Sequence, residues 1–279
     1  MLLRRLLGYV TLLAGVVLPL SARANQPQDW MLSAGKPGSY VNLDAVFGAF
    51  QASIEHRKNY YGMANQLTLR GSAIAAIPFG SAQIDADLRI VVLTFGASVG
   101  AVDSWRNQTF APGESLSRKE RREREAAGEI SAMGYGFVEG RLQLALPLND
   151  YMVFNSVAAL RVTGADKRSF DNLIGVVHDG NYLRSDVQLF FKHRRIGALA
   201  PMVQMLNFPL DGTRHTQLNY GFAFVSRAGL ARRDDLILFQ MLFHPGGDLG
   251  GYNNKDVYGL ATIRGPVTFT LAYRSVINL

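Results

Sequence analysis

Apolar and polar residues alternate one by one along most of the chain beyond about residue 40. The segment 83–93 is the clearest case. Its apolar positions are Ile84, Ala86, Leu88, Ile90 and Val92, and its polar positions are Gln83, Asp85, Asp87 and Arg89. A period of two places successive side chains on opposite faces of an extended strand. Such a strand has one apolar and one charged face, so its two faces must meet different environments.

The same alternation predicts strands throughout the rest of this region, at 40–53, 63–77, 139–146, 151–163, 183–192, 217–224, 237–243 and 267–279. Segments 173–177, 198–208 and 257–264 are also predicted as strands, without an assigned face. Short stretches rich in Gly, Pro, Asn and Asp separate many of these segments, and tight turns between successive strands indicate an antiparallel meander. The predicted count is about twelve strands, with ten and fourteen also compatible.

The last thirteen residues, 267–279, form a strand with one apolar and one polar face. The apolar face carries Val267, Phe269, Leu271, Tyr273, Ile277 and Leu279, interrupted only by Ser275. This segment resembles the closing strand and assembly signal of bacterial outer-membrane β-barrels, although Leu279 replaces the usual terminal Phe. The resemblance implies an all-β fold, a closed antiparallel transmembrane β-barrel in the outer membrane. It also implies recognition by the barrel assembly machinery through this strand, and it identifies no particular family.

The composition is compatible with that fold. Hydrophobic residues make up 48% of the chain, charged residues 18%, and there are 28 glycines. A membrane barrel is apolar outside and polar inside, and it must close because lipid offers no hydrogen-bond partner for an open sheet edge. A soluble β-sandwich would have a similar composition. However, a sandwich does not need apolar residues on the same outer face of every strand.

The N-terminus has the layout of a cleaved secretory signal peptide over residues 1–24. Arg4 and Arg5 precede an apolar run at 6–20, and Ala22-Arg23-Ala24 supplies a small-x-small cleavage site. We therefore expect one outer-membrane barrel domain over residues 25–279. Removing three arginines and no acidic residue lowers the formal net charge from +7 to +4, which does not indicate nucleic-acid binding. The chain has no Cys, so no disulfide can stabilise it.

Charged residues on the polar strand faces are the first candidate site, because they would line the lumen. Mixed acidic and basic groups there would form an eyelet for small polar solutes, or they would fill a narrow barrel with ion pairs. The sequence leaves this choice open. The predicted lumen-lining residues are Asp44, Arg70, Asp85, Asp87, Arg89, Glu139, Arg141, Arg161, Arg184, Asp186 and Arg274.

The second candidate site is a long connection, 103–129, with a charged run at 117–125. Capping-box spacing and i,i+4 pairs of opposite charge favour a short helix there. Its arginines would bind lipopolysaccharide phosphates or a partner protein outside the cell, or they would form a solvated loop. These arginines are Arg118, Arg121, Arg122 and Arg124.

No catalytic, metal or cofactor site is predicted. None of the five histidines lies two residues before a Ser, the arrangement that resemblance to outer-membrane phospholipases would require. The leading hypothesis is an integral outer-membrane barrel acting as a narrow porin-like channel for small polar solutes. The alternative is a non-conducting scaffold for an envelope partner or a homo-oligomer. A lipid-acting enzyme, dependent on His178 or His193, is a third and weaker hypothesis.

Overall fold

The computed structural model divides the chain into two units, Met1–Ser33 and Ala34–Leu279. It describes residues 36–46, 49–61, 65–76, 79–104, 109–110, 123, 126–127, 133–164, 168–171, 176–178, 180–193, 197–210, 212–227, 236–243 and 267–279. All of these lie in the second unit, so the predicted signal peptide falls outside the described residues. No helix among the described residues is long and apolar enough to span a membrane.

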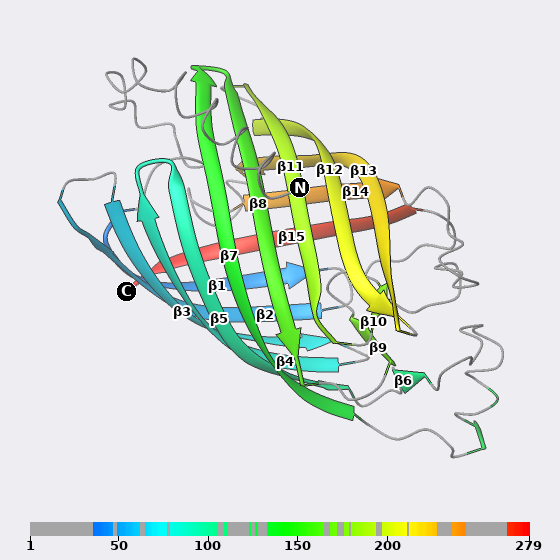
Figure 1. Cartoon of the computed structure of the whole chain (residues 1–279). Coiled ribbons are helices and arrows are strands. Elements are labelled where there is room, and N and C mark those ends of the chain that lie inside the picture. The colour runs from blue at the N-terminus through cyan, green and yellow to red at the C-terminus, as the bar shows by residue number, and fades with distance from the viewer. Residues whose placement is uncertain are drawn as a thin grey trace. The chain divides into compact units, whose positions relative to one another are not determined.

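Twelve antiparallel strands close into a barrel, as predicted for the fold class (Figure 1). The order around the barrel follows the chain, with each strand paired to its predecessor and the last paired to the first. The barrel strands are β1 (Gly38–Val46), β2 (Ala49–Asn59), β3 (Asn65–Ala76), β4 (Phe79–Ile90), β5 (Leu93–Ser104), β7 (Met133–Asn149), β8 (Met152–Thr163), β11 (Tyr182–His193), β12 (Gly197–Leu210), β13 (Thr213–Arg227), β14 (Leu236–Phe243) and β15 (Val267–Asn278).

Three short strands form a separate small sheet in the order β10-β9-β6. They are β6 (Thr109–Phe110), β9 (Arg168–Asp171) and β10 (Val176–His178), and they lie within the two long connections that follow β5 and β8. Backbone pairing of β6 with β9 therefore ties these two connections together. β10 also lies against β12.

The predicted number of strands is right, but two predicted segments each span the end of one strand and the start of the next. Segment 40–53 is not one strand, because β1 ends at Val46 and β2 begins at Ala49. Segment 83–93 likewise contains the end of β4 and the start of β5, and β5 itself was not predicted. Of segment 173–177, Val176 and Val177 belong to β10, outside the barrel. Segment 257–264 lies outside the described residues.

The turn between β4 and β5 explains one of these errors. It consists of Val91 and Val92 alone, because Ile90 pairs directly with Leu93. Val91 has a φ of 56°, a conformation that β-branched residues rarely adopt. Turn prediction relies on Gly, Asn, Asp and Pro, none of which is present here. Two valines between apolar neighbours look like a continuing strand.

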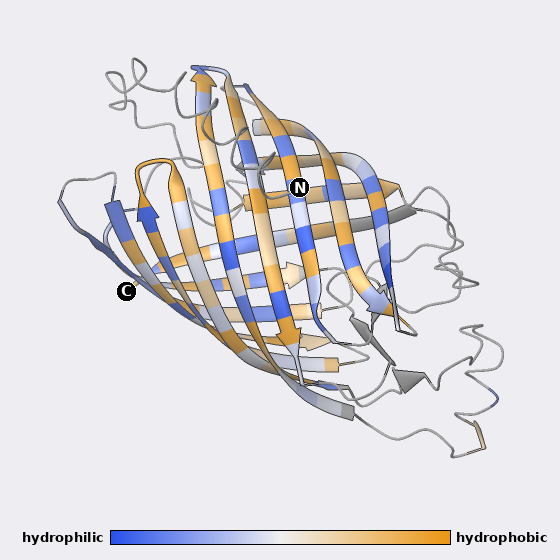
Figure 2. Ribbon diagram, in the orientation of Figure 1, coloured by the Kyte–Doolittle hydropathy of each residue, from blue (hydrophilic) through white to orange (hydrophobic). Residues whose placement is uncertain are grey.

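The two faces of the barrel wall differ in polarity, as the alternation predicts. Figure 2 shows hydrophilic and hydrophobic positions alternating along the ribbons. Large apolar side chains are exposed on the outer face, among them Ile54, Leu69, Ile84, Leu88, Phe95, Val99, Val138, Leu142, Leu160, Val187, Leu199, Val203, Leu218 and Leu271. Polar side chains are buried on the inner face, among them Asn42, Asp44, Ser53, Glu55, Asp85, Ser98, Glu139, Arg161, Gln204 and Asn219. Apolar side chains such as Phe79, Phe137, Leu206 and Phe208 are buried inside as well, so the interior is mixed while large apolar side chains are exposed outside. In a soluble protein, exposed apolar faces and buried charged residues are both unusual.

The two ends of the barrel differ in the length of their connections. The end that holds the start of β1 and the C-terminus has five connections of 2–8 residues. Three connections at the opposite end, 105–132, 164–181 and 244–266, are 28, 18 and 23 residues long. Short turns at one end and long loops at the other are typical of outer-membrane barrels, whose long loops are extracellular.

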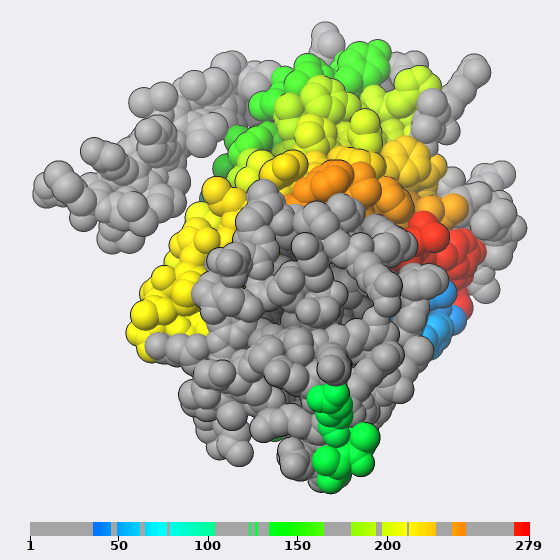
Figure 3. All heavy atoms as spheres, turned by 90° about the vertical axis from the view of Figure 1, so that its right-hand side faces the viewer, coloured from blue at the N-terminus to red at the C-terminus, as the bar shows by residue number. Residues whose placement is uncertain are grey.

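The barrel closes where the chain's first and last barrel strands meet. β1 pairs with β15 over seven positions, from Tyr40 opposite Asn278 to Val46 opposite Ala272. The backbone NH of Leu279 also donates to the carbonyl of Ser39, at 3.0 Å. Figure 3 shows β15 in red directly beside β1 in blue. The terminal strand identified in the sequence therefore closes the barrel.

Candidate functional site

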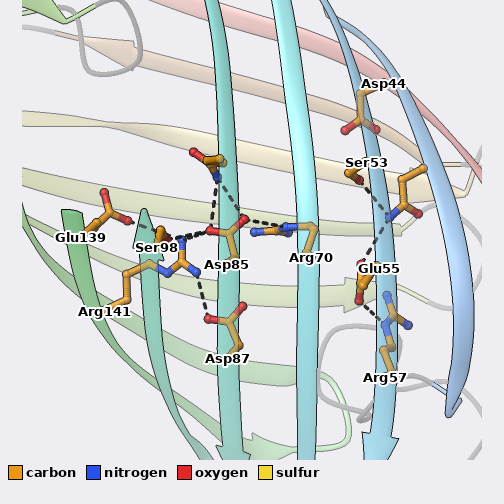
Figure 4. A network of polar contacts seen from close by, with 12 residues as sticks. Asp44, Ser53, Glu55, Arg57, Arg70, Asp85, Asp87, Ser98, Glu139 and Arg141 are labelled. Atoms are coloured by element: carbon orange, nitrogen blue, oxygen red, sulfur yellow. Dashed lines mark hydrogen bonds and ion pairs between the residues drawn. The ribbon is translucent and has the colours of Figure 1, made fainter. Parts of the chain in front are cut away.

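The inner wall carries a connected network of charged side chains centred on Asp85 of β4 (Figure 4). The Asp85 carboxylate accepts hydrogen bonds from Ser98 Oγ at 2.7 Å, Arg70 Nε at 3.1 Å and Arg141 Nη1 at 3.2 Å. Gln83 Nε2 donates to both of its oxygens. Burying a carboxylate without partners is costly, and these donors compensate the loss of water.

Arg141 of β7 joins three acidic residues. Its guanidinium reaches across β5 to β4, where Nη2 lies 2.9 Å from Asp87 Oδ1 in addition to the contact with Asp85. It also lies 3.5 Å from Glu139 Oε1 on its own strand. This reach needs space on β5, and the residue beneath the guanidinium is Gly96. A Cβ at Gly96 would lie 2.9 Å from Arg141 Nε and 2.3 Å from Asp87 Oδ1.

A fully buried ion pair continues the network onto β8. Arg161 Nη2 lies 2.7 Å from Glu139 Oε2, and both side chains are buried. The Arg161 guanidinium also stacks on Phe137, 4.2 Å from the ring centre, and approaches the Tyr182 ring at 5.7 Å. Cation–π contacts of this kind replace part of the hydration that a buried guanidinium loses.

A second group of charges lies at the seam, the boundary where β1 pairs with β15 and closes the barrel. Arg274 of β15 binds Asp44 of β1 in a bidentate contact, with Nε at 2.6 Å and Nη2 at 2.9 Å from the two carboxylate oxygens. On β2, Glu55 pairs with Arg57 and accepts a hydrogen bond from Asn42 Nδ2. The bidentate contact joins two residues 230 positions apart, and it bridges the strands that close the barrel.

Polar contacts extend around the inner wall beyond the charged network. Asn155 links Gln143 and Gln188 through amide hydrogen bonds of 2.8 and 2.9 Å. Asp186 lies 3.1 Å from Arg184 Nε and accepts from Gln204 Nε2 at 3.0 Å. These bonds connect β7, β8, β11 and β12 at the level of the inner side chains.

The inner face of β12 and β13 is different, because most of its residues are apolar and buried. These strands stand six positions around the barrel from β3 and β4, so the apolar wall faces the charged wall. Its buried apolar residues are Ala198, Ala200, Met202, Leu206, Phe208, Leu210, Ala223 and Val225. Three buried amides, Gln204, Gln217 and Asn219, interrupt this apolar wall. The charged side has a buried apolar cluster of its own, formed by Ala76, Phe79, Val102, Tyr135 and Phe137.

The structure places the predicted lumen-lining residues on the inner face and brings ten of them into ion pairs. Those ten are Asp44, Arg70, Asp85, Asp87, Glu139, Arg141, Arg161, Arg184, Asp186 and Arg274. Arg89, at the end of β4, donates from Nε to the carbonyl of Val91 at 3.0 Å.

Several residues of the network were missed by the sequence analysis. Glu55 and Arg57 were missed because the alternation over 40–53 predicts a single strand, and nothing in it indicates where β2 begins. Ser98 and Gly96 lie on β5, which was not predicted. One signal in the sequence would have indicated space on this part of the inner wall. Small residues occupy every inward position in the alternating stretch Gly96-Ala97-Ser98-Val99-Gly100, and they leave room for long side chains from the neighbouring strands.

The second candidate site, with Arg118, Arg121, Arg122 and Arg124, lies outside the described residues. His178, one of the two histidines of the enzyme hypothesis, is in β10 of the small sheet, whereas His193 ends β11 of the barrel. Among the described residues, no group of three or more His, Asp or Glu side chains is arranged to hold a metal ion.

No family model matches the chain, and no curated protein matches it. Among solved structures, the NanC porin aligns over 87% of this chain and 99% of its own, with 10% identity and a TM-score of 0.41. The KdgM porin aligns over 85% and 96%, with 4% identity and a TM-score of 0.42. CdiB from Acinetobacter baumannii aligns over 86% of this chain and 46% of its own, with 12% identity and a TM-score of 0.44. The proposed function therefore rests on the geometry of the barrel itself.

Proposed function

We propose that this protein is an integral outer-membrane β-barrel that acts as a narrow porin-like channel for small polar solutes. The observation that carries the proposal is the reversed polarity of the wall, with exposed apolar residues outside and charged residues inside a closed ring of twelve strands. Only a closed barrel satisfies every backbone hydrogen bond of a sheet in lipid. A charged inner wall is the type of surface that polar solutes can pass.

The number of strands limits the width of such a channel. Strands spaced about 4.8 Å apart and tilted by about 40° give a twelve-strand barrel a backbone radius of about 12 Å. Inward side chains occupy roughly half of that radius. The packed apolar wall of β12 and β13 narrows the interior further, so the proposed solutes are small.

Single-channel recording in planar bilayers tests the channel. Purified protein, folded as shown by heat-modifiable migration on gels, is expected to give discrete conductance steps that are small compared with those of wide porins. Folded protein that inserts into the bilayer without conducting would reject the channel.

A second candidate function is a non-conducting scaffold that holds a partner in the cell envelope. The observation in its favour is the extent of ion pairing on the inner wall, where Asp85 and Glu139 are buried and fully engaged. Such a wall stabilises a filled barrel as well as a conducting one. The scaffold predicts that deleting residues 115–128 abolishes partner capture while the barrel still folds, and unchanged pull-down partners after the deletion would contradict it.

The location rests on the same features. We propose that a signal peptide, 1–24, directs export, that the assembly machinery recognises the strand 267–279, and that lipid and lipopolysaccharide surround the apolar outer face. N-terminal sequencing of protein from purified outer membranes should find Asn25 first. A retained Met1 would contradict cleavage.

A further inference from the structure

The partners in the inner-wall ion pairs differ in how far they reach toward the lumen. Among the ion pairs between described residues, the arginine is the more exposed partner in every pair except Arg141 with Asp87. The Arg70 side chain is 29% exposed, whereas that of its partner Asp85 is 0% exposed. At the seam, Arg274 is 43% exposed and Asp44 is 5% exposed.

The cause is the difference in side-chain length. An aspartate carboxylate stays next to the backbone of the wall, while an arginine extends over it and keeps its guanidinium in water. Gly96 adds to this difference in exposure. Because it has no side chain, Arg141 can extend across β5 and lie over Asp85, on the lumen side of the carboxylate. The buried side chains described on the inner face of β12 and β13 are apolar or are neutral amides, so they add no charge to the surface that a solute would meet.

We propose that the lumen selects small anions, because it presents guanidinium groups to solutes and keeps most carboxylates beneath them. This inference rests on the proposed channel and names its solute class. The selecting groups are Arg57, Arg70, Arg141, Arg184 and Arg274, which come from β2, β3, β7, β11 and β15. Guanidinium donors fit carboxylate and phosphate oxygens in a planar fork, so solutes bearing those groups match this surface.

This selectivity does not come from an excess of positive over negative charge in the lumen. Each ion pair is neutral as a whole, but its positive end lies nearer the solute. The nearer charge contributes more to the potential that a permeating ion meets, and at 0.1 M salt the Debye length of about 10 Å exceeds the lumen radius of about 6 Å, so this potential reaches across the lumen. At 1 M salt the Debye length falls to about 3 Å and the effect should largely disappear.

The test is the zero-current potential of single channels in a KCl gradient centred on about 0.1 M. Wild-type channels should pass chloride about seven times more readily than potassium, as a positive potential of about kT gives. Two double variants leave the net charge unchanged and keep amide groups for hydrogen bonding. R70Q/D85N removes the ion pairs of Asp85 with Arg70 and with Arg141, and R274Q/D44N removes the pair between β15 and β1. Each should lower the chloride preference to about twofold.

A matched control removes one positive and one negative charge away from the lumen. Lys58 is exposed on the outer face of β2, beside Tyr60, and Asp150 is exposed in the turn between β7 and β8. The variant K58Q/D150N should keep the wild-type preference. Heat-modifiable migration identifies variants that fold, and the two lumen doubles provide independent tests if one of them does not.

The possible results distinguish a failure of anion selectivity from a failure of the proposed channel. Conductance with no anion preference, or an anion preference unchanged in both lumen doubles, would overturn the inference and leave the channel standing. A preference that persists undiminished at 1 M salt would also contradict it. Absence of conductance would reject the channel and the inference together.

Discussion

Gly96 offers a direct test of how the inner-wall network is built. In the variant G96A, the added Cβ would lie 2.3 Å from Asp87 Oδ1 and 2.9 Å from Arg141 Nε. Ordinary contacts between such atoms begin near 3.4 Å, so both side chains must move. Because the clashing atoms belong to flexible side chains, the backbone of β5 can stay in place. The cost therefore falls on the ion pairs of Arg141.

The magnitude follows from the contacts that are lost. Arg141 contacts Asp87 at 2.9 Å and Asp85 at 3.2 Å, and charged hydrogen bonds at a partly solvated site contribute about 1 kcal/mol each. Losing both costs about 2 kcal/mol, and replacing Gly by Ala returns about 0.5–1 kcal/mol by restricting the unfolded chain. The expected net loss in the free energy of unfolding is about 1–1.5 kcal/mol.

The assay is urea unfolding in lipid vesicles, followed by gel mobility. The matched control is G140A, because Gly140 lies on the outer face of β7 and a Cβ there meets nothing within 4 Å. G140A should unfold at the wild-type urea concentration or slightly above it, while G96A should unfold at a lower one. Equal stability of the two variants would refute the idea that position 96 needs a glycine to leave space for the Arg141 side chain.

Three other substitutions test separate parts of the fold. On β4, I84R places a charge at the middle of the outer face and should cost about 2–4 kcal/mol, whereas I90R at the strand end should cost at most about 1 kcal/mol; equal urea midpoints would contradict a bilayer around this face. At the seam, R274Q leaves the buried Asp44 carboxylate without its bidentate partner and should lower the free energy of unfolding by about 1–3 kcal/mol, which D44N/R274Q should largely restore in a double-mutant cycle. In the turn between β4 and β5, V91G relieves the positive φ of Val91 and should raise stability by about 1 kcal/mol; a loss of stability on thermal melting would count against strain there.

The fold class could be predicted because lipid outside and polar groups inside impose a period of two on every strand. This pattern survives low sequence similarity, and it correctly assigned the faces of β4 and β15. Strand boundaries were harder, since the turn at Val91 and Val92 has no turn residues. The count of twelve agreed only because unrecognised β2 and β5 were balanced by segments that do not supply barrel strands or lie outside the described residues.

The sequence predicted which charged residues lie at the candidate site, but it did not predict which of them form ion pairs. Charged residues at polar strand positions identified most of the network, including Asp85 and Arg141. Which acid pairs with which base depends on register between neighbouring strands, and the sequence does not specify register. The contact between Asp44 and Arg274 needs the closure of the barrel, and the reach of Arg141 to β4 needs a glycine on the strand between them. The greater exposure of the arginines is likewise visible only with the barrel assembled.

The central claim is that the wall of this barrel has lipid on one face and its charged residues on the other. The chain contains no Cys, so a spin label on a single introduced Cys reports one position unambiguously. We would measure label accessibility to oxygen, which partitions into lipid, and to a water-soluble nickel complex, for I84C, L88C, Q83C and R89C in vesicles. Labels at 84 and 88 should be accessible to oxygen, and labels at 83 and 89 to the nickel complex. Accessibility that does not alternate, or that alternates in the opposite sense, would contradict the account.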